Sequence, residues 1–203
     1  MENLKVMVVI GSVRLGRQSH KVARYLENIL GQFAHTEITV LDLLDEPLPM
    51  MDERYDLHPD PPDLVRRTGE RIRSADAFIF VSPEYGGSYP GVLKNLTDLF
   101  GRQMTGKAIG VVTTSSGKMG GINASHQLQH LVLSMRSYPM PLKLLIPFVH
   151  EAFDEQLKPL HAELHTSANQ FIRTFLEFAS AITAMRQGKF KPRQAQEAVP
   201  GEV

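Results

Sequence analysis

The sequence predicts an α/β fold in which one parallel sheet of five strands is covered by helices on both faces. Short apolar runs alternate with amphipathic stretches along the chain, which is the pattern of strands joined by crossover helices. The first run, residues 4–10, is apolar at every position except Lys5, as expected of a strand buried on both faces. The chain has 203 residues, which is long enough for one large domain with a sizeable core.

The first half of the chain contains two predicted strands, one helix and a long loop. Residues 4–10 form the first strand, and apolar side chains recur at helical spacing over residues 19–30, where Gly31 ends the helix. Residues 36–41 are rich in β-branched side chains, which favours a second strand. Repeated prolines over residues 45–62 exclude a regular element and predict a surface loop, and long loops in compact domains are often functional.

The second half repeats this alternation. Each remaining strand is a short apolar run, and each helix shows apolar residues at intervals of three or four. Because strands and helices alternate throughout, the connections between parallel strands should be right-handed crossovers. The predicted helices lie near residues 64–72, 92–100 and 128–135, and the predicted strands at residues 77–81, 107–113 and 142–146.

The C-terminal part contains one more helix and a polar tail. Apolar residues at helical spacing predict a helix over residues 171–185, which Gly188 ends. Residues 189–203 show no apolar periodicity, so we predict that they are disordered. With no internal repeat and no interdomain linker in the sequence, we expect a single domain over residues 1–188.

Charge and composition exclude several classes of protein. The chain carries 22 basic and 22 acidic residues, whereas nucleic-acid binders show a basic excess and small electron carriers a strongly acidic surface. It contains no cysteine, which excludes disulfides, thiolate catalysis, iron–sulfur clusters and cysteine-bound zinc. The sequence shows no charged leader and no apolar window as long as a membrane span. We therefore expect a cytoplasmic protein that binds neither nucleic acid nor membranes.

The segment after the first strand, residues 11–19, has the composition of a phosphate-binding loop. Ligands of open parallel sheets bind beyond the carboxyl ends of the strands, where this segment lies. Its glycines allow the backbone to approach an anion, Ser12 and Ser19 can donate hydroxyl hydrogens, and Arg14 can pair with phosphate oxygens. The helix that follows adds free backbone N–H groups and the positive end of its dipole.

Two well-known phosphate loops do not match this segment. Val13 occupies the position where the dinucleotide fingerprint requires glycine. Arg17 and Gln18 stand where the triphosphate loop has lysine followed by serine or threonine, so the usual magnesium ligand is missing. The remaining interpretation is a monophosphate site. The alternative is a polar turn in which Ser19 caps the helix.

Two further loops at strand ends can face the same ligand. Residues 82–95 are rich in proline and glycine, which hold a non-repeating backbone whose amides and carbonyls can face a planar heterocycle. Residues 113–121 contain small side chains that permit close approach to the same ring. Each segment alone is also consistent with an ordinary turn. In residues 82–95, Ser88 would then cap the helix that follows. The occurrence of three such loops at strand ends favours one shared pocket.

These loops resemble those of the NADPH-dependent FMN reductase family, which includes chromate, quinone and azo-dye reductases. The similarity covers nearly the whole chain up to the last helix. Its motifs are Gly11-Ser12-x-Arg14 with Ser19, the run from Pro83-Glu84-Tyr85 to Ser88, Pro90-Gly91-x-Leu93-Lys94-Asn95, and Ser116-Gly117 with Gly120-Gly121.

The resemblance implies a flavodoxin-like three-layer sandwich that binds FMN as cofactor and uses NADPH or NADH as co-substrate. It implies that family members form homodimers or homotetramers with the flavin near a subunit interface. It places the flavin phosphate on Ser12, Arg14, Gln18 and Ser19. It places the isoalloxazine ring against Pro83, Glu84, Tyr85 and Gly86, with Ser115, Ser116 and Gly117 closing the other side.

Three positions differ from the family pattern. Gly86 stands where asparagine usually follows Pro-Glu-Tyr, so only backbone contacts are expected from this residue. Asn123 and Gln129 stand where arginines are often found, which leaves open the nicotinamide-phosphate or tetramer contacts that such arginines make.

The expected activity follows from the three loops and the resemblance. NAD(P)H would deliver hydride to the flavin, and a quinone, azo compound, free flavin or chromate would then be reduced in the same cleft by a ping-pong scheme. No catalytic side chain is required for this chemistry, and no metal ligand set is expected, because the pairs His126–His130 and His161–His165 have no obvious third ligand. The alternatives are a flavin-dependent redox sensor or an electron carrier that acts through a protein partner.

Overall fold

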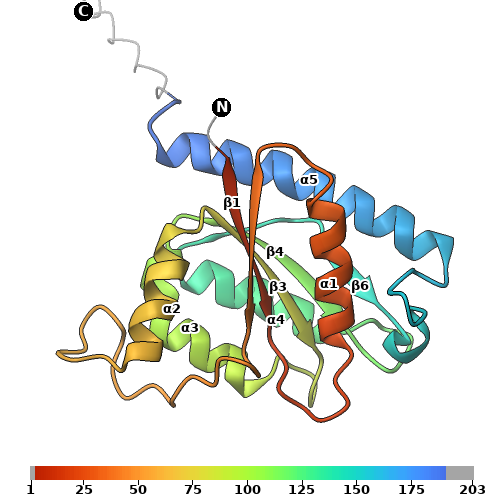
Figure 1. Ribbon diagram of the computed structural model, residues 1–203, viewed down its shortest axis with the longest axis horizontal. Helices are drawn as coiled ribbons and strands as arrows, with labels where there is room; N and C mark the ends of the chain where they lie inside the picture. Colours follow the sequence, from red (N-terminus) through yellow and green to blue (C-terminus); the bar gives the residue numbers. More distant parts are fainter. Residues whose placement is uncertain (1–2, 191–203) are drawn as a thin grey trace, which may run out of the picture.

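The computed structural model describes residues 3–190 and contains one six-stranded parallel sheet (Figure 1). The strand order is β2-β1-β3-β4-β5, and β6 also pairs with β4. This is the flavodoxin-like order, in which the chain changes direction across the sheet at β1. The strands are β1 Leu4–Ile10, β2 Thr36–Asp42, β3 Ala77–Pro83, β4 Ala108–Thr114, β5 Tyr138–Pro139 and β6 Leu144–Ile146.

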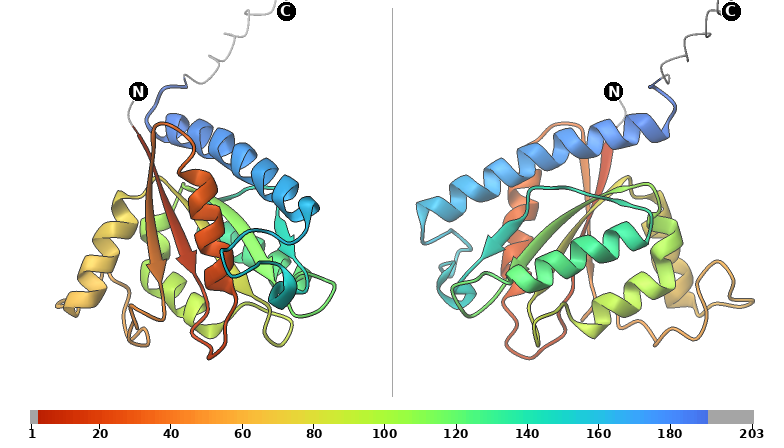
Figure 2. Two further views of the ribbon diagram at one scale, coloured as in Figure 1. Left: turned by 45° about the vertical axis from the view of Figure 1, so that its right-hand side comes forward. Right: turned by 180° about the vertical axis from the view of Figure 1, so that it is seen from behind.

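Helices cover both faces of the sheet, which confirms the predicted three-layer α/β sandwich. The left-hand view of Figure 2 shows α2 and α3 on one side of the strands and α1 on the other. α5 packs with α1 on that second side, and α4 packs against β4 on the side of α2 and α3. The helices are α1 Ser19–Leu30, α2 Asp63–Ser74, α3 Gly91–Met104, α4 Ile122–Ser134 and α5 Ala162–Arg186, with a 3₁₀ turn η1 at Val149–Glu151.

The alternation of side chains along β1 explains why this strand is apolar at nearly every position. Val6 and Val8 point into the core under α1 and α5, whereas Met7 and Val9 point into the core under α2, α3 and α4. All four are 0–1% exposed. Because successive strand side chains face opposite sides, a strand covered on both faces must be continuously apolar.

The prediction of one strand over residues 142–146 is wrong in extent. Two short strands, β5 and β6, pair with the two halves of β4. Between them Met140 donates its N–H to Ile109 O, and the chain then leaves the sheet at Pro141. Proline has no N–H for the ladder, so two prolines within three residues restrict regular pairing here.

The last two helices begin earlier than the apolar pattern predicts. α5 begins at Ala162 rather than at residue 171, and α4 begins at Ile122 rather than at residue 128. Most side chains over residues 162–167 of α5 are exposed, so its first turns carry no apolar stripe. No helix among residues 3–190 is long and apolar enough to cross a membrane. The predicted tail lies outside the described residues from residue 191 onward.

The proline-rich loop over residues 45–62 is fixed to α3. The buried Asn95 side chain donates to Pro49 O at 2.8 Å and accepts the N–H of Met51 at 2.8 Å. Further along the loop, Tyr55 donates its N–H to Leu99 O. The loop therefore has no regular element, as predicted, but its backbone groups are held by the helix below it.

A buried lysine joins α2 to the N-terminal end of β4. Lys107, 2% exposed, donates to the carbonyls of Ile72 and Arg73 in the last turn of α2 at 2.8 and 2.9 Å. Its ammonium also lies 5.5 Å from the centre of the Phe78 ring. Burial lowers the pKa of Lys107 from its ordinary value of 10.5 to about 8.

This shift predicts a pH-dependent stability. Between the two pKa values the unfolded chain binds the Lys107 proton more tightly than the folded protein does, so the free energy of unfolding rises with pH. Urea unfolding of wild type and Lys107→Met should show the wild type gaining about 2 kcal/mol relative to the variant between about pH 7.5 and about pH 9.5. A difference between the two proteins that is independent of pH contradicts this account.

Candidate functional site

One pocket lies beyond the carboxyl ends of the strands, at the lower edge of the sheet in Figure 1, where the loops after β1, β3, β4 and β6 meet. Every residue predicted from sequence lines this pocket except Gly86 and Gly117. Five lining residues were not predicted: Gly16, Arg17, Thr114, Val149 and His150. The complete lining is Ser12, Arg14, Gly16, Arg17, Gln18, Ser19, Pro83, Glu84, Tyr85, Thr114, Ser115, Ser116, Val149 and His150.

The loop after β1, from which Ser12, Arg14 and Gly16 line the pocket, carries unpaired backbone donors. The N–H groups of residues 13–16 donate to no protein acceptor in the described part of the chain. Gly16 has φ +70°, a left-handed conformation that glycine adopts without strain. Gln18 donates its side-chain amide to Gly16 O at 3.1 Å and closes the loop just before α1. A loop of this kind, followed by a helix N-terminus, is suited to an anion.

Ser19 and Arg14 add polar side chains that form no hydrogen bond with the described residues. Ser19 is 1% exposed, and its buried Oγ has no hydrogen-bond partner among the described residues. Buried hydroxyls are nearly always hydrogen-bonded, so this one indicates a ligand position. Arg14 is exposed, and its side chain makes no hydrogen bond or ion pair within residues 3–190.

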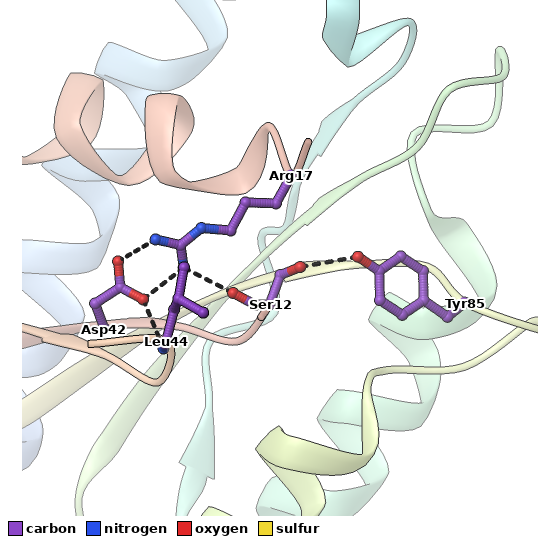
Figure 3. Close-up of polar contacts among 5 residues, drawn as sticks. All are labelled: Ser12, Arg17, Asp42, Leu44 and Tyr85. Carbon is purple, nitrogen blue, oxygen red and sulfur yellow. Dashed lines mark hydrogen bonds and ion pairs between the residues drawn. The ribbon is translucent and has the colours of Figure 1, made fainter. Parts of the chain in front are cut away.

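Arg17, by contrast, uses three of the five N–H donors of its guanidinium in hydrogen bonds to the protein. Its guanidinium donates to both carboxylate oxygens of Asp42 at 2.5 and 2.6 Å and to Ser12 O at 2.7 Å (Figure 3). Burial alone would raise the pKa of Asp42, but the hydrogen bonds from Arg17 and from the Leu44 N–H outweigh it. The pKa of this carboxyl therefore lies below its ordinary value.

The loop after β3 contacts the loop after β1 through two hydroxyls. Ser12 Oγ and Tyr85 OH lie 2.8 Å apart (Figure 3). Tyr85 and Ser88 exchange backbone hydrogen bonds across a tight turn, in which Gly86 and Gly87 have φ +56° and +76°. Gly86 thus supplies the turn conformation, and it does not line the pocket.

The loop after β3 is also fixed to α4. The Glu84 carboxylate accepts the N–H groups of Asn123 and Ala124 at 3.0 and 3.1 Å, which caps the N-terminus of this helix. Four residues further along, Gln127 donates to Gly87 O and accepts from the Ser88 hydroxyl. Glu84 therefore acts on the position of its loop, with a negative charge placed favourably at the positive end of a helix dipole.

The loop after β4 is held by the segment that follows β6. Ser115 donates its N–H to Ile146 O and accepts the N–H of Val149 on its carbonyl. The Ser115 hydroxyl donates to Gly117 O at 2.8 Å, so Gly117 closes a turn just outside the pocket. This pairing brings Val149 and the exposed His150 to the pocket wall.

Asn123 and Gln129, which differ from the family pattern, both form hydrogen bonds within this chain. Asn123 donates its side-chain amide to Glu84 at 3.3 Å, and Gln129 donates to Met140 O at 3.1 Å. Of the histidines considered above, His165 lies 2.7 Å from Tyr25 OH through Nδ1. Among the described residues, no three histidine or acidic side chains gather as a metal site.

Some of the unpredicted lining residues could have been identified from the sequence, and others could not. Val149 and His150 follow the last strand, so the rule that ligands bind at strand carboxyl ends points to them. For Arg17 the sequence shows only an arginine in a glycine-containing loop, which does not indicate its role. Its pairing with Asp42 depends on tertiary structure, because the two residues are brought together by the parallel pairing of β1 and β2.

The chain matches one family profile, several curated reductases and a solved flavoenzyme structure. The profile of the family described as NADPH-dependent FMN reductase matches residues 4–151. A quinone reductase of Pseudomonas putida is 36% identical over 189 residues, which cover 89% of this chain and 96% of the relative. An FMN-dependent NADPH-azoreductase of Staphylococcus saprophyticus is 28% identical over 172 residues, 82% of this chain and 86% of the relative. The structure of FerB, a flavoenzyme NAD(P)H:(acceptor) oxidoreductase of Paracoccus denitrificans, matches with a TM-score of 0.76 and 26% identity over 88% of this chain and 98% of that one.

Proposed function

The chain belongs to the NADPH-dependent FMN reductase family, and on this premise we propose that the pocket beyond the strand ends holds the FMN at which NAD(P)H and a small acceptor react. The protein is an FMN-dependent NAD(P)H oxidoreductase. The proposed cofactor position rests above all on Ser19, which lines the pocket and whose buried hydroxyl has no partner among the described residues.

The loop after β1 fits the phosphate of FMN. A phosphate dianion needs several donors, and the N–H groups of residues 13–16, the Ser19 hydroxyl and the Arg14 guanidinium are all without protein acceptors in the described chain. Ser12 and Gln18 line the same part of the pocket. We therefore assign the phosphate to Ser12, Arg14, Gln18 and Ser19.

The other two loops fit the ring system of the cofactor. Pro83, Glu84 and Tyr85 line the pocket from β3, and Ser115 and Ser116 line it from β4. Gly86 and Gly117 lie at the turns of these loops and belong to the proposed ring site through their backbone. Bound FMN would supply the redox chemistry, namely hydride transfer from NAD(P)H and reduction of the acceptor. The side chains of the chain bind and orient, and none is needed as a nucleophile.

The acceptor and the order of binding are further parts of the proposal. The matched relatives are a quinone reductase and an azoreductase, which supports quinones and azo compounds, and free flavin or chromate extend the same class of small acceptors. Donor and acceptor would share the open side of the pocket, so the first must leave before the second enters. Parallel double-reciprocal plots in steady state are the expected signature of this ping-pong order.

The activity is tested directly by absorbance under anaerobic conditions. We expect the FMN-loaded protein to lose its visible flavin absorbance when NADPH or NADH is added and to regain it when a quinone is added. Titrating each nicotinamide separately then gives the preference between the two. Failure of both nicotinamides to reduce the bound flavin contradicts the proposed function.

Replacing Glu84 should weaken the ring site rather than the phosphate site. Glu84→Ala removes the cap of α4, which we expect to lower the free energy of unfolding by about 0.5–2 kcal/mol. Because the loop after β3 is then less well fixed, the dissociation constants for FMN and for riboflavin should both rise by a similar factor of about 3 to 10. Quenching of flavin fluorescence measures both constants.

The amide variant is the matched control for this prediction. Glu84→Gln keeps one acceptor oxygen for the N–H groups of Asn123 and Ala124 but loses the charge, so its effect should be intermediate. An alanine variant that weakens FMN binding and leaves riboflavin binding unchanged would place Glu84 at the phosphate instead.

A homodimer or homotetramer in the cytoplasm completes the proposal. Leu133, Tyr138 and Leu142 are exposed by 61%, 41% and 36% at the edge formed by α4 and β5, which supports an apolar contact between copies. A cytoplasmic location is supported by the need for NAD(P)H, which is regenerated inside cells. Light scattering on the purified protein measures the oligomeric state, and a monomer at all concentrations contradicts this part.

A further inference from the structure

Arg17 lines the pocket, yet its hydrogen bonds go to the protein. Its three short hydrogen bonds, to both oxygens of Asp42 and to Ser12 O, fix the guanidinium between the end of β2 and the start of the loop (Figure 3). The side chains of Arg17 and Asp42 are only 12% and 10% exposed, so solvent screens the ion pair weakly. This arrangement holds two segments of the chain in one position.

The contact with the Ser12 carbonyl also sets the direction of the next N–H group. All described peptide bonds are trans, so the Ser12 carbonyl and the Val13 N–H point in opposite directions across one planar unit. Because Arg17 holds the carbonyl on its own side, the Val13 N–H is turned away from Arg17. That N–H and those of residues 14–16 have no acceptor in the described chain.

The ion pair also has an electrostatic consequence for an anion in this loop. An unneutralised Asp42 carboxylate near the loop would repel a phosphate dianion. Arg17 neutralises it, and in doing so both arms of its guanidinium are occupied by the carboxylate. The end-on face of the guanidinium is used in this way, so only its Nε–Nη2 edge is without a protein acceptor among the described residues. Arg14, without a partner among the described residues, is left as the cation of the loop.

We infer that Arg17 and Asp42 are a positioning pair for the cofactor phosphate: they fix the Ser12 carbonyl, and with it the direction of the Val13 N–H, and they cancel the Asp42 charge, without Arg17 itself contacting the phosphate. The inference rests on the proposed FMN site. It assigns specificity for FMN over unphosphorylated riboflavin to an ion pair outside the set of phosphate ligands.

The test compares FMN and riboflavin binding to the apoprotein, because riboflavin has the ring but no phosphate. Dissociation constants are measured by flavin fluorescence quenching for wild type, Arg17→Met, Asp42→Asn and the double variant. We expect Arg17→Met, which frees the Ser12 carbonyl and leaves the Asp42 charge unneutralised, to raise the constant for FMN about 10-fold or more. Asp42→Asn removes the repelling charge together with the partner that holds Arg17, so it should raise the constant by less, about 3-fold, and both variants should leave that for riboflavin within about 2-fold. The double variant should be no weaker than Arg17→Met, because the two residues act as one unit.

Asp42→Asn separates positioning from direct contact. If Arg17 is a phosphate ligand, removing the Asp42 charge frees it, and the constant for FMN stays unchanged or falls; that result overturns the inference while leaving the FMN site intact. A wild type that binds FMN no more tightly than riboflavin overturns the phosphate assignment under the proposed function and the inference with it. The two failures are therefore distinguishable.

Two controls guard against loss of the fold. Arg71 makes a similar ion pair with Glu46 and also donates to a backbone carbonyl, that of Val40, but does not line the pocket. Arg71→Met should leave the ratio of the two flavin affinities unchanged. Arg17→Lys keeps the positive charge but cannot form the bidentate contact with Asp42, so the variant should lose part of the preference for FMN over riboflavin. A variant that keeps the whole preference contradicts the inference. Retained riboflavin binding shows that each variant is folded.

Discussion

Arg14→Ala is expected to raise the dissociation constant for FMN by about 10- to 100-fold and to leave riboflavin binding nearly unchanged. Arg14 is exposed at the pocket and has no protein partner among the described residues, so its charge is available to the phosphate. A hydrogen bond to a charged group contributes about 1.5–3 kcal/mol, which corresponds to this range of affinity. Calorimetric titration of the apoprotein with each flavin measures both constants.

The matched control is another exposed arginine whose side chain makes no hydrogen bond or ion pair in the described chain. Arg67 lies on the exposed face of α2, away from the pocket. Arg67→Ala lowers the net charge by the same amount but should leave FMN binding unchanged. Equal losses in the two variants would mean that only long-range attraction is involved, and equal loss of FMN and riboflavin affinity in Arg14→Ala would place Arg14 at the ring.

Gly110→Ala is expected to lower the free energy of unfolding by about 1–3 kcal/mol, because the core between β4 and α5 is already full. A Cβ at Gly110 would lie 2.9 Å from Phe175 Cδ2 and 3.0 Å from Phe171 Cζ. Both rings are completely buried and stack on each other with an interplanar angle of 7°. Neither ring can move without disturbing the other or shifting α5.

Gly91→Ala is the matched control for this substitution. Gly91 is the first residue of α3, and a Cβ there meets no atom within 4 Å. Because alanine favours helix, we expect the free energy of unfolding to stay the same or to rise slightly. Urea unfolding followed by circular dichroism measures both variants. An unchanged stability in Gly110→Ala would mean that the packing of α5 on β4 is looser than the structure indicates.

The parts of the fold that follow from periodicity are those whose burial is regular. β1 and α1 have the bounds that the sequence predicts, because β1 is buried on both faces and α1 buries one continuous stripe. The start of α5 could not be predicted, since its first turns are largely exposed and carry no stripe. The split of the last strand into β5 and β6 depends on where prolines interrupt the ladder, which apolar content does not reveal.

For the candidate site, too, the sequence indicates some features, and others depend on tertiary structure. Loop positions after β1, β3 and β4 were accessible from sequence, because strand order and the location of ligands at strand ends are general properties of such sheets. The roles of individual side chains were less accessible. The family resemblance places Glu84 at the ring, but its carboxylate also caps α4. No sequence pattern indicates the role of Arg17, which binds Asp42 and the Ser12 carbonyl. Both roles depend on partners distant in sequence.

The central claim is that the loop after β1 binds the phosphate of FMN, and one comparison tests it most directly. The wild-type apoprotein is titrated with FMN and with riboflavin under identical conditions, by fluorescence quenching or calorimetry. With Arg14, Ser19 and several backbone N–H groups free to bind the phosphate, FMN should bind at least about 100-fold more tightly than riboflavin. Equal affinities for the two flavins would contradict the claim.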